Sequence, residues 1–333
     1  MAKASFDQLG EFELIDAIRR LAVTRVRGSQ SLKVGIGDDA AVFNPKGPVA
    51  QTTDTFVEGV HFKRSWLSAG ALGRRAFRAA VSDLSAMGAT PRWVLLSLSL
   101  PPDWFGPHAV ALARGLVRDA ATVGATLAGG NITAGRDLTI TVTVSGVVST
   151  AAVTRDRARA GDSVFVTGAP GLARAGLQAL LEGRRRGRAV EAWRTPPLRT
   201  HLGKRLAAFA GLGAMIDVSD GLVQDLGHMA RSSKVGVIVE RDSLPLPASI
   251  LRQAGSHRRA IEIVLAGGED YELVFTTRPG REVAVQRLCL RLGVPVNRIG
   301  RVVAGSPAIV SEDGSDLGVA IRGHDHARTR RSK

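Results

Sequence analysis

Cysteine is almost absent from this chain, because Cys289 is the only one among 333 residues. A single thiol excludes both a disulfide framework and a cysteine-rich metal site, so we expect a reducing compartment, the cytoplasm. No apolar run approaches the length needed to cross a bilayer, and the first residues carry acids where a secretory signal would need an apolar stretch. The sequence therefore predicts a soluble cytoplasmic protein that is not attached to a membrane.

Aromatic residues are also scarce. They make up 5% of the chain, which is too few for a platform on which single-stranded nucleic acid could stack. The formal net charge of +15 could attract nucleic-acid phosphates, but the basic residues are mostly arginine and are thinly spread, with clusters only at residues 183–188 and in the C-terminal tail. Solvated surface arginine explains this distribution about as well, so nucleic-acid binding is kept only as a minor alternative.

The familiar phosphate-binding signatures are missing. The chain has neither G-x-x-x-x-G-K-[ST] nor the H-R-D and D-F-G motifs of protein kinases. The segment "TGAPGLARAG" (167–176) follows a predicted strand and opens a predicted helix. Its glycines could allow close approach of the backbone to a phosphate, or could simply form a tight turn. Any phosphoryl transfer would therefore depend on metal ions rather than on a lysine clamp.

A nicotinamide-binding fingerprint is matched only superficially. Gly35, Gly37 and Ala40 in "VGIGDDAAVF" fit the form G-x-G-x-x-A. The fingerprint requires a helix after the glycines to hold a pyrophosphate, whereas the continuation here resembles a strand. The adjacent Asp38 and Asp39 would also repel the ligand. We therefore reject dinucleotide binding.

The pattern of apolar residues predicts a mixed α+β protein with two domains. A chain of 333 residues, 44% of them hydrophobic, can bury two cores. Helices are predicted at residues 9–23, 72–87, 108–123, 172–183, 221–233 and 283–293, and strands at 32–43, 48–57, 92–101, 137–148, 163–168, 235–240, 271–277 and 298–303. Without strict βαβ alternation, α+β is favoured over a doubly wound sheet. A polar, arginine-rich stretch at 149–162 indicates a junction between domains at 1–149 and 150–333.

Oxygen-bearing side chains recur at the edges of apolar segments, beside glycine or serine. They are Asp38, Asp39, Asp54, Asp83, Asn131, Asp217, Asp220, Glu269 and Asp270. One such pair alone would most simply be a turn whose side chains bond back to the backbone, but the recurrence favours a shared site. Carboxylates that lie together raise one another's pKa unless a cation compensates them, and hard oxygen ligands select magnesium. The sequence therefore predicts a magnesium site for phosphate chemistry.

Several segments together resemble the thiamine-monophosphate kinase family, which belongs to the superfamily of ATP enzymes related to aminoimidazole-ribonucleotide synthetase. In order they are "GEFELID", "IGDDAA", "TTDTFVEGVHF", "VSDLSAMGA", "GGN", "GDSVFVTG", "IDVSDGL" and "GGEDYEL", and the match runs from about residue 9 to 326. The resemblance implies direct transfer of the ATP γ-phosphoryl group to thiamine monophosphate, giving thiamine diphosphate and ADP without a phosphoenzyme. It also implies several Mg²⁺ ions.

The fold implied by the resemblance is a two-domain PurM-like fold. The N-terminal domain would hold metal and ATP and pair its strands across a homodimer, and the C-terminal α+β domain would complete the ATP and substrate cleft. Roles follow by position. The implied metal ligands are Asp39, Thr52, Thr53, Asp54, Asp83, Asn131, Asp217 and Asp220. The implied catalytic residues are Asp54, Asp83 and Asp220. The implied ATP contacts are Gly130, Asn131, Arg155 and Ser219. The implied thiamine-monophosphate contacts are His61, Glu269 and His324.

Three positions depart from the family pattern. Asn131 stands where many relatives have Asp, and His324 and Ala327 replace an aromatic residue and a closing Phe. Ser219 also fits the N-cap of the helix predicted after it, and such a helix start attracts phosphate. The alternatives that remain are another ATP-dependent enzyme of the superfamily, such as aminoimidazole-ribonucleotide synthetase, and a basic nucleic-acid-binding protein.

Overall fold

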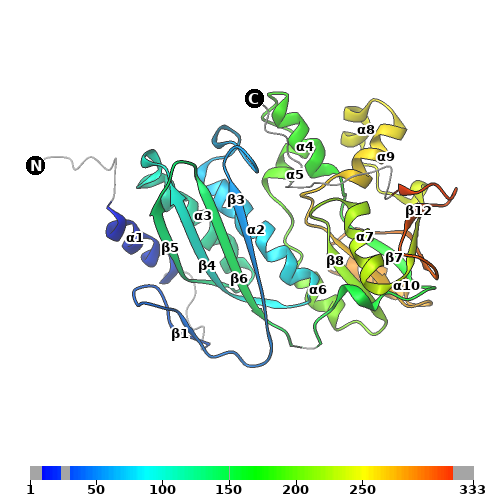
Figure 1. The fold of residues 1–333 in the computed structure, drawn as a ribbon, viewed down its shortest axis with the longest axis horizontal. Coiled ribbons are helices and arrows are strands. Elements are labelled where there is room, and N and C mark those ends of the chain that lie inside the picture. Colours follow the sequence, from blue (N-terminus) through cyan, green and yellow to red (C-terminus); the bar gives the residue numbers. More distant parts are fainter. Residues whose placement is uncertain (1–9, 24–30, 150, 318–333) are drawn as a thin grey trace, which may run out of the picture. The chain divides into compact units, whose positions relative to one another are not determined.

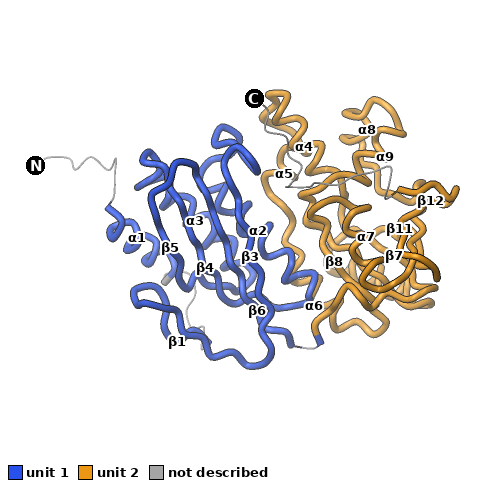
Figure 2. The backbone as a smooth tube through the Cα atoms, in the orientation of Figure 1, with its two compact units in different colours: residues 1–151 blue, residues 152–333 orange. Residues whose placement is uncertain are grey.

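The chain forms two compact units, residues Met1–Ala151 and Ala152–Lys333 (Figure 2). The computed structural model describes residues 10–23, 31–149 and 151–317. Both units combine helices with β-sheets, which confirms the predicted α+β class. Within the described ranges, none of the helices combines the length and the apolar character that a bilayer crossing requires.

A four-stranded sheet forms the centre of the first unit (Figure 1). Its strands, in spatial order, are β3 (Val49–Val57), β6 (Thr139–Val147), β4 (Thr90–Leu100) and β5 (Thr126–Ala134). β6 is antiparallel to both of its neighbours, whereas β4 and β5 are parallel. In β6 the aliphatic Ile140, Val142 and Val144 are buried and the threonines between them are half-exposed, so the predicted alternation is confirmed.

Helices cover one face of this sheet. They are α2 (Ala69–Ala86) and α3 (Pro107–Thr122), and α1 (Glu11–Val23) packs against α3. α2 and α3 approach closely through glycine. A Cβ atom on Gly73 would lie 2.0 Å from the carbonyl oxygen of Leu112, and one on Gly115 would lie 1.9 Å from that of Gly70. Only glycine therefore allows the two helix backbones to make contact at these points.

One predicted strand is wrong. Residues 32–43 form two short antiparallel strands, β1 (Leu32–Val34) and β2 (Val42–Phe43), rather than one. Gly37 adopts a φ of +117°, which a residue with a side chain rarely adopts, and the chain turns there. β2 follows the glycines where a dinucleotide fingerprint would need a helix, so the observed backbone agrees with the rejection of that motif.

A six-stranded sheet forms the centre of the second unit. Its strands, in spatial order, are β12 (Ile309–Ser311), β9 (Gly236–Val239), β11 (Val296–Val303), β7 (Ser163–Thr167), β10 (Leu273–Thr277) and β8 (Leu212–Asp217). All neighbouring pairs are antiparallel except β12 with β9. The helices are α4 (Leu172–Leu181), α5 (Arg188–Arg194), α6 (Thr200–Ala207), α7 (Leu222–Ser233), α8 (Ala248–Ala254), α9 (His257–Ala266) and α10 (Glu282–Arg291). A buried aliphatic core with members from α7, β9 and β10 joins these layers.

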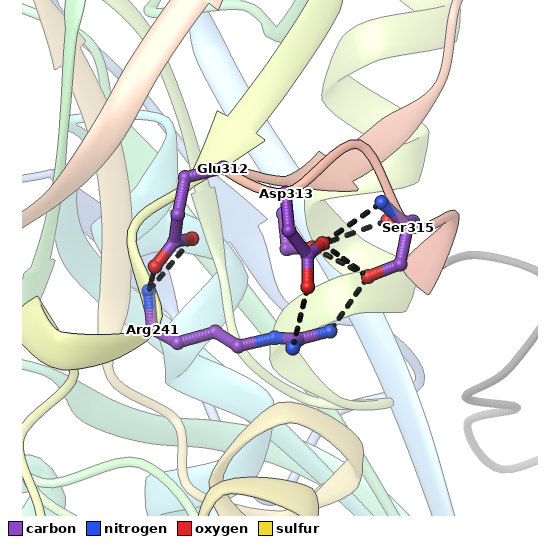
Figure 3. Close-up of polar contacts among 5 residues, drawn as sticks. Arg241, Glu312, Asp313 and Ser315 are labelled. Atoms are coloured by element: carbon purple, nitrogen blue, oxygen red, sulfur yellow. Dashed lines mark hydrogen bonds and ion pairs between the residues drawn. The ribbon is translucent and has the colours of Figure 1, made fainter.

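The turn after β12 is fastened to Arg241 (Figure 3). The backbone N–H of Arg241 donates to the carboxylate of Glu312 at 3.1 Å, and its guanidinium donates to Asp313 at 3.2 Å and to Ser315 at 2.7 Å. Hydrogen bonds from Ser311 and Ser315, and to a smaller extent the charge of Arg241, hold the pKa of Asp313 below its usual range. The contacts fix the end of the described chain against the segment that follows β9.

Candidate functional site

In the first unit two carboxylates and a hydroxyl gather between β3 and α2. Thr52 and Asp54 alternate along β3 on the face that the helices cover, and Asp83 comes from α2. The hydroxyl of Thr52 donates to Asp83 Oδ2 at 2.5 Å. Burial, and then the charge of Asp83, raises the pKa of Asp54 to about 6. Because the charge of Asp83 contributes to this shift, the two carboxylates lie close enough for one cation to interact with both.

Thr53 is placed differently from Thr52. Its hydroxyl lies 3.0 Å from that of Thr143 on β6, and the hydroxyls of Thr55 and Thr141 are 2.9 Å apart. Because successive residues of a strand point to opposite faces, this threonine row is on the face away from Asp54. Thr53 could serve as a metal ligand only through its backbone oxygen, not through its hydroxyl.

Asp38 and Asp39 of "VGIGDDAAVF" lie in the exposed turn between β1 and β2. The backbone N–H of Asp39 donates to Asp38 Oδ1 at 2.9 Å, so Asp38 has the turn-forming role that an isolated pair suggests. Asp39 itself is exposed.

Gly130 and Asn131 lie within β5, at the edge of the first sheet. Both are exposed, and they pair with Leu96 and Ser97 of β4. A Cβ atom on Gly130 would lie 1.9 Å from the carbonyl oxygen of Leu96, so glycine is required there. Gly130 and Asn131 therefore form an exposed part of this edge strand.

His61 is held by the main chain. Its Nδ1 accepts the backbone N–H of Val57 at 3.0 Å, and its ring meets Phe56 edge-on at 6.0 Å between centroids. Because Nδ1 accepts, the neutral ring carries its proton on Nε2. Glu58 and Asp103 both bind Arg64, at 2.6 and 2.7 Å, which ties the segment around His61 to a neighbouring loop. His61 is thus oriented as a donor through Nε2.

In the second unit the segments "IDVSDGL" and "GGEDYEL" lie side by side. Backbone N–H groups of Glu269 and Tyr271 donate to the carbonyl oxygens of Ser219 and Val218, at 2.7 and 2.8 Å. Glu269 and Tyr271 have φ values of +64° and +52°, a conformation that costs free energy for residues other than glycine. The paired backbone holds both in this conformation, which brings Glu269 next to the loop that carries Asp220.

The loop before α7 is organised by a carboxylate. Asp225 Oδ2 accepts the backbone N–H groups of Ser219, Asp220 and Gly221 at 3.1, 3.2 and 3.1 Å. Burial raises the pKa of Asp225 to about 7, although these donors oppose the shift. The prediction that Ser219 caps the helix is wrong, because Gly221 is the N-cap residue and the amides in front of it bind Asp225. These amides are therefore not available as hydrogen-bond donors to a phosphate.

Asp220, Asp225 and His228 form a small cluster. One ligand atom from each lies within 4.8 Å of the others. Burial, followed by the charges of Arg231 and Arg155, lowers the pKa of His228.

Arg155 is exposed in a short 3-10 helix, Arg155–Arg157, that packs against α7. Its carbonyl oxygen accepts the hydroxyl of Ser233 at 2.7 Å. The second unit thus brings Arg155 near Asp220. Asp217 is buried at the end of β8.

The glycine-rich start of α4 does not offer free amides to a phosphate. Asp270 is buried, and its carboxylate accepts the N–H groups of Gly171 and Ala173 at 2.5 and 2.9 Å. Burial raises the pKa of Asp270 well above its ordinary value. Of the two alternatives for "TGAPGLARAG", the structure therefore favours the turn.

Two residues that sequence reasoning missed act on the predicted substrate segment. Trp193 of α5 is fully buried, and its indole Nε1–H donates to Glu269 Oε2 at 2.8 Å. Arg199 binds Glu272 through two bonds of 2.6 and 2.7 Å. A cavity of about 620 Å³ adjoins this region, and Asp270, Glu272 and Arg199 line part of it. His324 lies outside the described residues, as does Ala327.

Comparison with known proteins gives consistent matches over most of the chain. Residues 37–148 match the family described as AIR synthase related protein, N-terminal domain, and residues 159–311 match its C-terminal domain. Thiamine-monophosphate kinase of Haemophilus influenzae is 35% identical over 305 residues, covering 88% of this chain and 89% of that protein.

Solved structures of similar sequence have the same fold. Thiamine-monophosphate kinase from Stenotrophomonas maltophilia K279a superposes with a TM-score of 0.79 at 35% identity, covering 92% of this chain and 98% of that one. A structure described as AaThiL complexed with AMPPCP and TMP gives a TM-score of 0.74 at 32% identity, covering 98% of this chain and 100% of that one.

Proposed function

The chain belongs to the thiamine-monophosphate kinase family, and from this premise we propose that it transfers the γ-phosphoryl group of ATP to the phosphate of thiamine monophosphate. The products are thiamine diphosphate and ADP. The family membership predicted from the sequence segments is confirmed. The observation that carries the proposal within the chain itself is the group Thr52, Asp54 and Asp83, whose hydroxyl and carboxylate oxygens lie together between β3 and α2.

The residues of this group fit a magnesium ion. Carboxylate and hydroxyl oxygens are hard ligands, and Thr52, Asp54 and Asp83 offer them together. In the second unit Asp217 and Asp220 would hold magnesium. When bound, magnesium would supply positive charge that neutralises the phosphate oxygens during transfer. Asp39, Thr53 and Asn131 remain predicted ligands.

The other predicted residues have chemistry that suits two phosphate-bearing substrates. The exposed guanidinium of Arg155 and the hydroxyl of Ser219 would bind ATP, together with the exposed Gly130. His61 would donate from Nε2 to thiamine monophosphate, because its Nδ1 is engaged by Val57. Glu269, oriented by Trp193, would accept a hydrogen bond from the same substrate.

We also propose that the protein is a homodimer in the cytoplasm. The face of the first sheet that carries Thr53, Thr55, Thr141 and Thr143 is opposite the helices, and β3 is an edge strand. A regular polar face of this kind suits pairing with a second copy. Light scattering of the purified protein should give twice the mass of the chain. A monomeric mass at micromolar concentration would contradict the dimer.

The reaction is tested with a panel of monophosphates. The protein is incubated with ATP, magnesium and each monophosphate in turn, and ADP and thiamine diphosphate are measured. We expect turnover with thiamine monophosphate. ADP formation only with another monophosphate, such as an aminoimidazole precursor, would overturn the proposal. Salt-sensitive retention on DNA that Asp83→Ala leaves unchanged, without turnover, would favour a nucleic-acid-binding protein.

Direct transfer is tested separately. With labelled ATP and magnesium but no acceptor, the protein should remain unlabelled. A phosphorylated protein that goes on to form thiamine diphosphate would show that the transfer has two steps.

A further inference from the structure

Three consecutive backbone amides in the second unit point at one oxygen atom. The N–H groups of Ser219, Asp220 and Gly221 all donate to Oδ2 of Asp225, which is only 2% exposed. Such a run of amides at the start of a helix normally attracts an anion from outside. Here the anion is a side chain from the first turn of α7, so the loop carries its own counter-charge.

This arrangement also fixes the direction of the carbonyl oxygens and side chains of the loop before α7. Because its N–H groups are directed at Asp225, its carbonyl oxygens and side chains face other partners. The carbonyl oxygen of Ser219 accepts the N–H of Glu269 at 2.7 Å, and Asp220 Oδ2 accepts from Gln224 Nε2 at 3.2 Å. Asp225 therefore determines the position of two residues, Ser219 and Asp220, that the proposed function assigns to ATP and to metal.

The choice of a carboxylate is informative. Burying a charged group is costly unless hydrogen bonds compensate it, and a neutral cap would fill a helix start at lower cost. A carboxylate oxygen can accept several hydrogen bonds at once, so Oδ2 of Asp225 holds the three N–H donors in a defined geometry. Rigid support of this kind matters where a neighbouring carboxylate must meet a metal ion at a set distance.

We propose that Asp225 is a positioning residue that holds Asp220 and Ser219 in the geometry needed to bind the metal–nucleotide complex. The proposal rests on the proposed function, and it adds a residue that does not itself touch substrate. Removal of such supporting groups typically weakens metal affinity or activity about 10- to 100-fold.

The matched control is Asp162, a buried aspartate of the same unit. It accepts the N–H of Arg159, the hydroxyl of Thr276 and the guanidinium of Arg278. Asp162 precedes β7 at the end of the sheet where Ser163 pairs with Thr277, whereas Asp217 pairs with Leu273 at the other end. Asp162→Asn therefore removes a comparable buried charge away from the loop.

The experiment compares the wild-type chain with Asp225→Asn, Asp225→Glu and Asp162→Asn. Binding of Mn²⁺ in the presence of AMPPCP is followed by the paramagnetic resonance signal of free Mn²⁺, alongside kcat, the Mg²⁺ concentration for half-maximal activity, and Tm. We expect both Asp225 variants to weaken Mn²⁺ binding about 10- to 100-fold and to raise the Mg²⁺ requirement similarly. Asp162→Asn should lower Tm while binding Mn²⁺ as the wild type does.

Wild-type Mn²⁺ affinity in folded Asp225 variants would overturn the proposal. Equal loss of affinity in Asp162→Asn would also overturn it, because the effect would then be general destabilisation. If Asp225→Asn does not fold, Asp225→Glu decides, since it keeps the charge but displaces it by one methylene. A wild-type chain that binds Mn²⁺ with AMPPCP but forms no thiamine diphosphate would refute the proposed substrate and leave the role of Asp225 testable.

Discussion

The two units treat their carboxylates in opposite ways. In the first, Asp54 and Asp83 adjoin each other, and the hydroxyl of Thr52 donates to Asp83. The pKa of Asp54 is raised mainly by burial and then by the charge of Asp83. In the second, Asp225 and Asp270 accept backbone N–H groups and shape the loops around them. The difference separates acids that present charge to a ligand from acids that build the frame for it.

The largest effect on activity should come from Asp220, a proposed metal ligand in the second unit. Asp220→Ala removes a proposed metal ligand, and kcat should fall about 1,000-fold while Tm changes by less than about 2 °C. Steady-state kinetics and thermal unfolding check this. Asp242→Ala, at an exposed aspartate of the same unit, is the control. Full activity in Asp220→Ala would remove Asp220 from the site.

The comparison predicts that removing the charge of Asp54 stabilises the folded protein. Asp54→Asn should lower kcat about 100-fold yet raise the free energy of unfolding of the metal-free protein by about 1 kcal/mol at pH 8. The folded-state pKa of Asp54, about 6, exceeds its ordinary value of 3.8. Ionised Asp54 therefore lowers the free energy of unfolding, and this loss is complete at pH values above about 6. The difference between the two proteins should therefore shrink as the pH falls from 8 towards 4.

Chemical unfolding in EDTA measures this difference. A loss of stability in Asp54→Asn at pH 8 would mean that Asp54 acts as a frame-building acid like those of the second unit, and the contrast would fail.

An intermediate effect should come from Trp193→Phe. This change removes the indole donor to Glu269 and leaves an aromatic ring in the core. We expect the KM for thiamine monophosphate to rise about fivefold to tenfold with a smaller change in kcat, as for the loss of one bond to a charged group. Phe165→Leu, in the buried core of the same unit, controls for loosened packing. Equal KM changes in both variants would assign the effect to packing.

The smallest effect should follow from Arg241→Ala. The Arg241 contacts in Figure 3 lie at the surface, where ion pairs contribute little. Tm should fall by no more than about 2 °C, with unchanged kinetics. A larger fall in Tm would show that the turn after β12 supports the sheet more than its exposure suggests.

Regular elements could be predicted from sequence where the pattern was strong. The alternation of β6 and the helical spacing of Leu14, Ile18 and Ala22 in α1 both correspond to observed burial. β5 was missed because its "GGN" centre has no apolar alternation, and its strand conformation depends on pairing with β4. The strand at 32–43 was overextended because apolar residues on both sides of a turn look continuous.

The site was foreseen in part. Period-two alternation along β3 places Thr52 and Asp54 on one face and Thr53 on the other. The sequence therefore already contained the difference between the two threonines. Asp225, an acid in the first turn of a helix, also carried a local signal. The bond from Trp193 to Glu269 could not be foreseen, since 76 residues separate the two and neither position has a local pattern.

The glycine contacts between α2 and α3 bear on how Asp83 can respond to a ligand. At Gly73 against Leu112 and at Gly115 against Gly70, the two helix backbones meet with no side chain between them. α2 can hardly slide or rotate without displacing its neighbour. The backbone that carries Asp83 is therefore held in place by both helices. A cation that binds there must fit the observed position of this backbone, because α2 cannot move towards it.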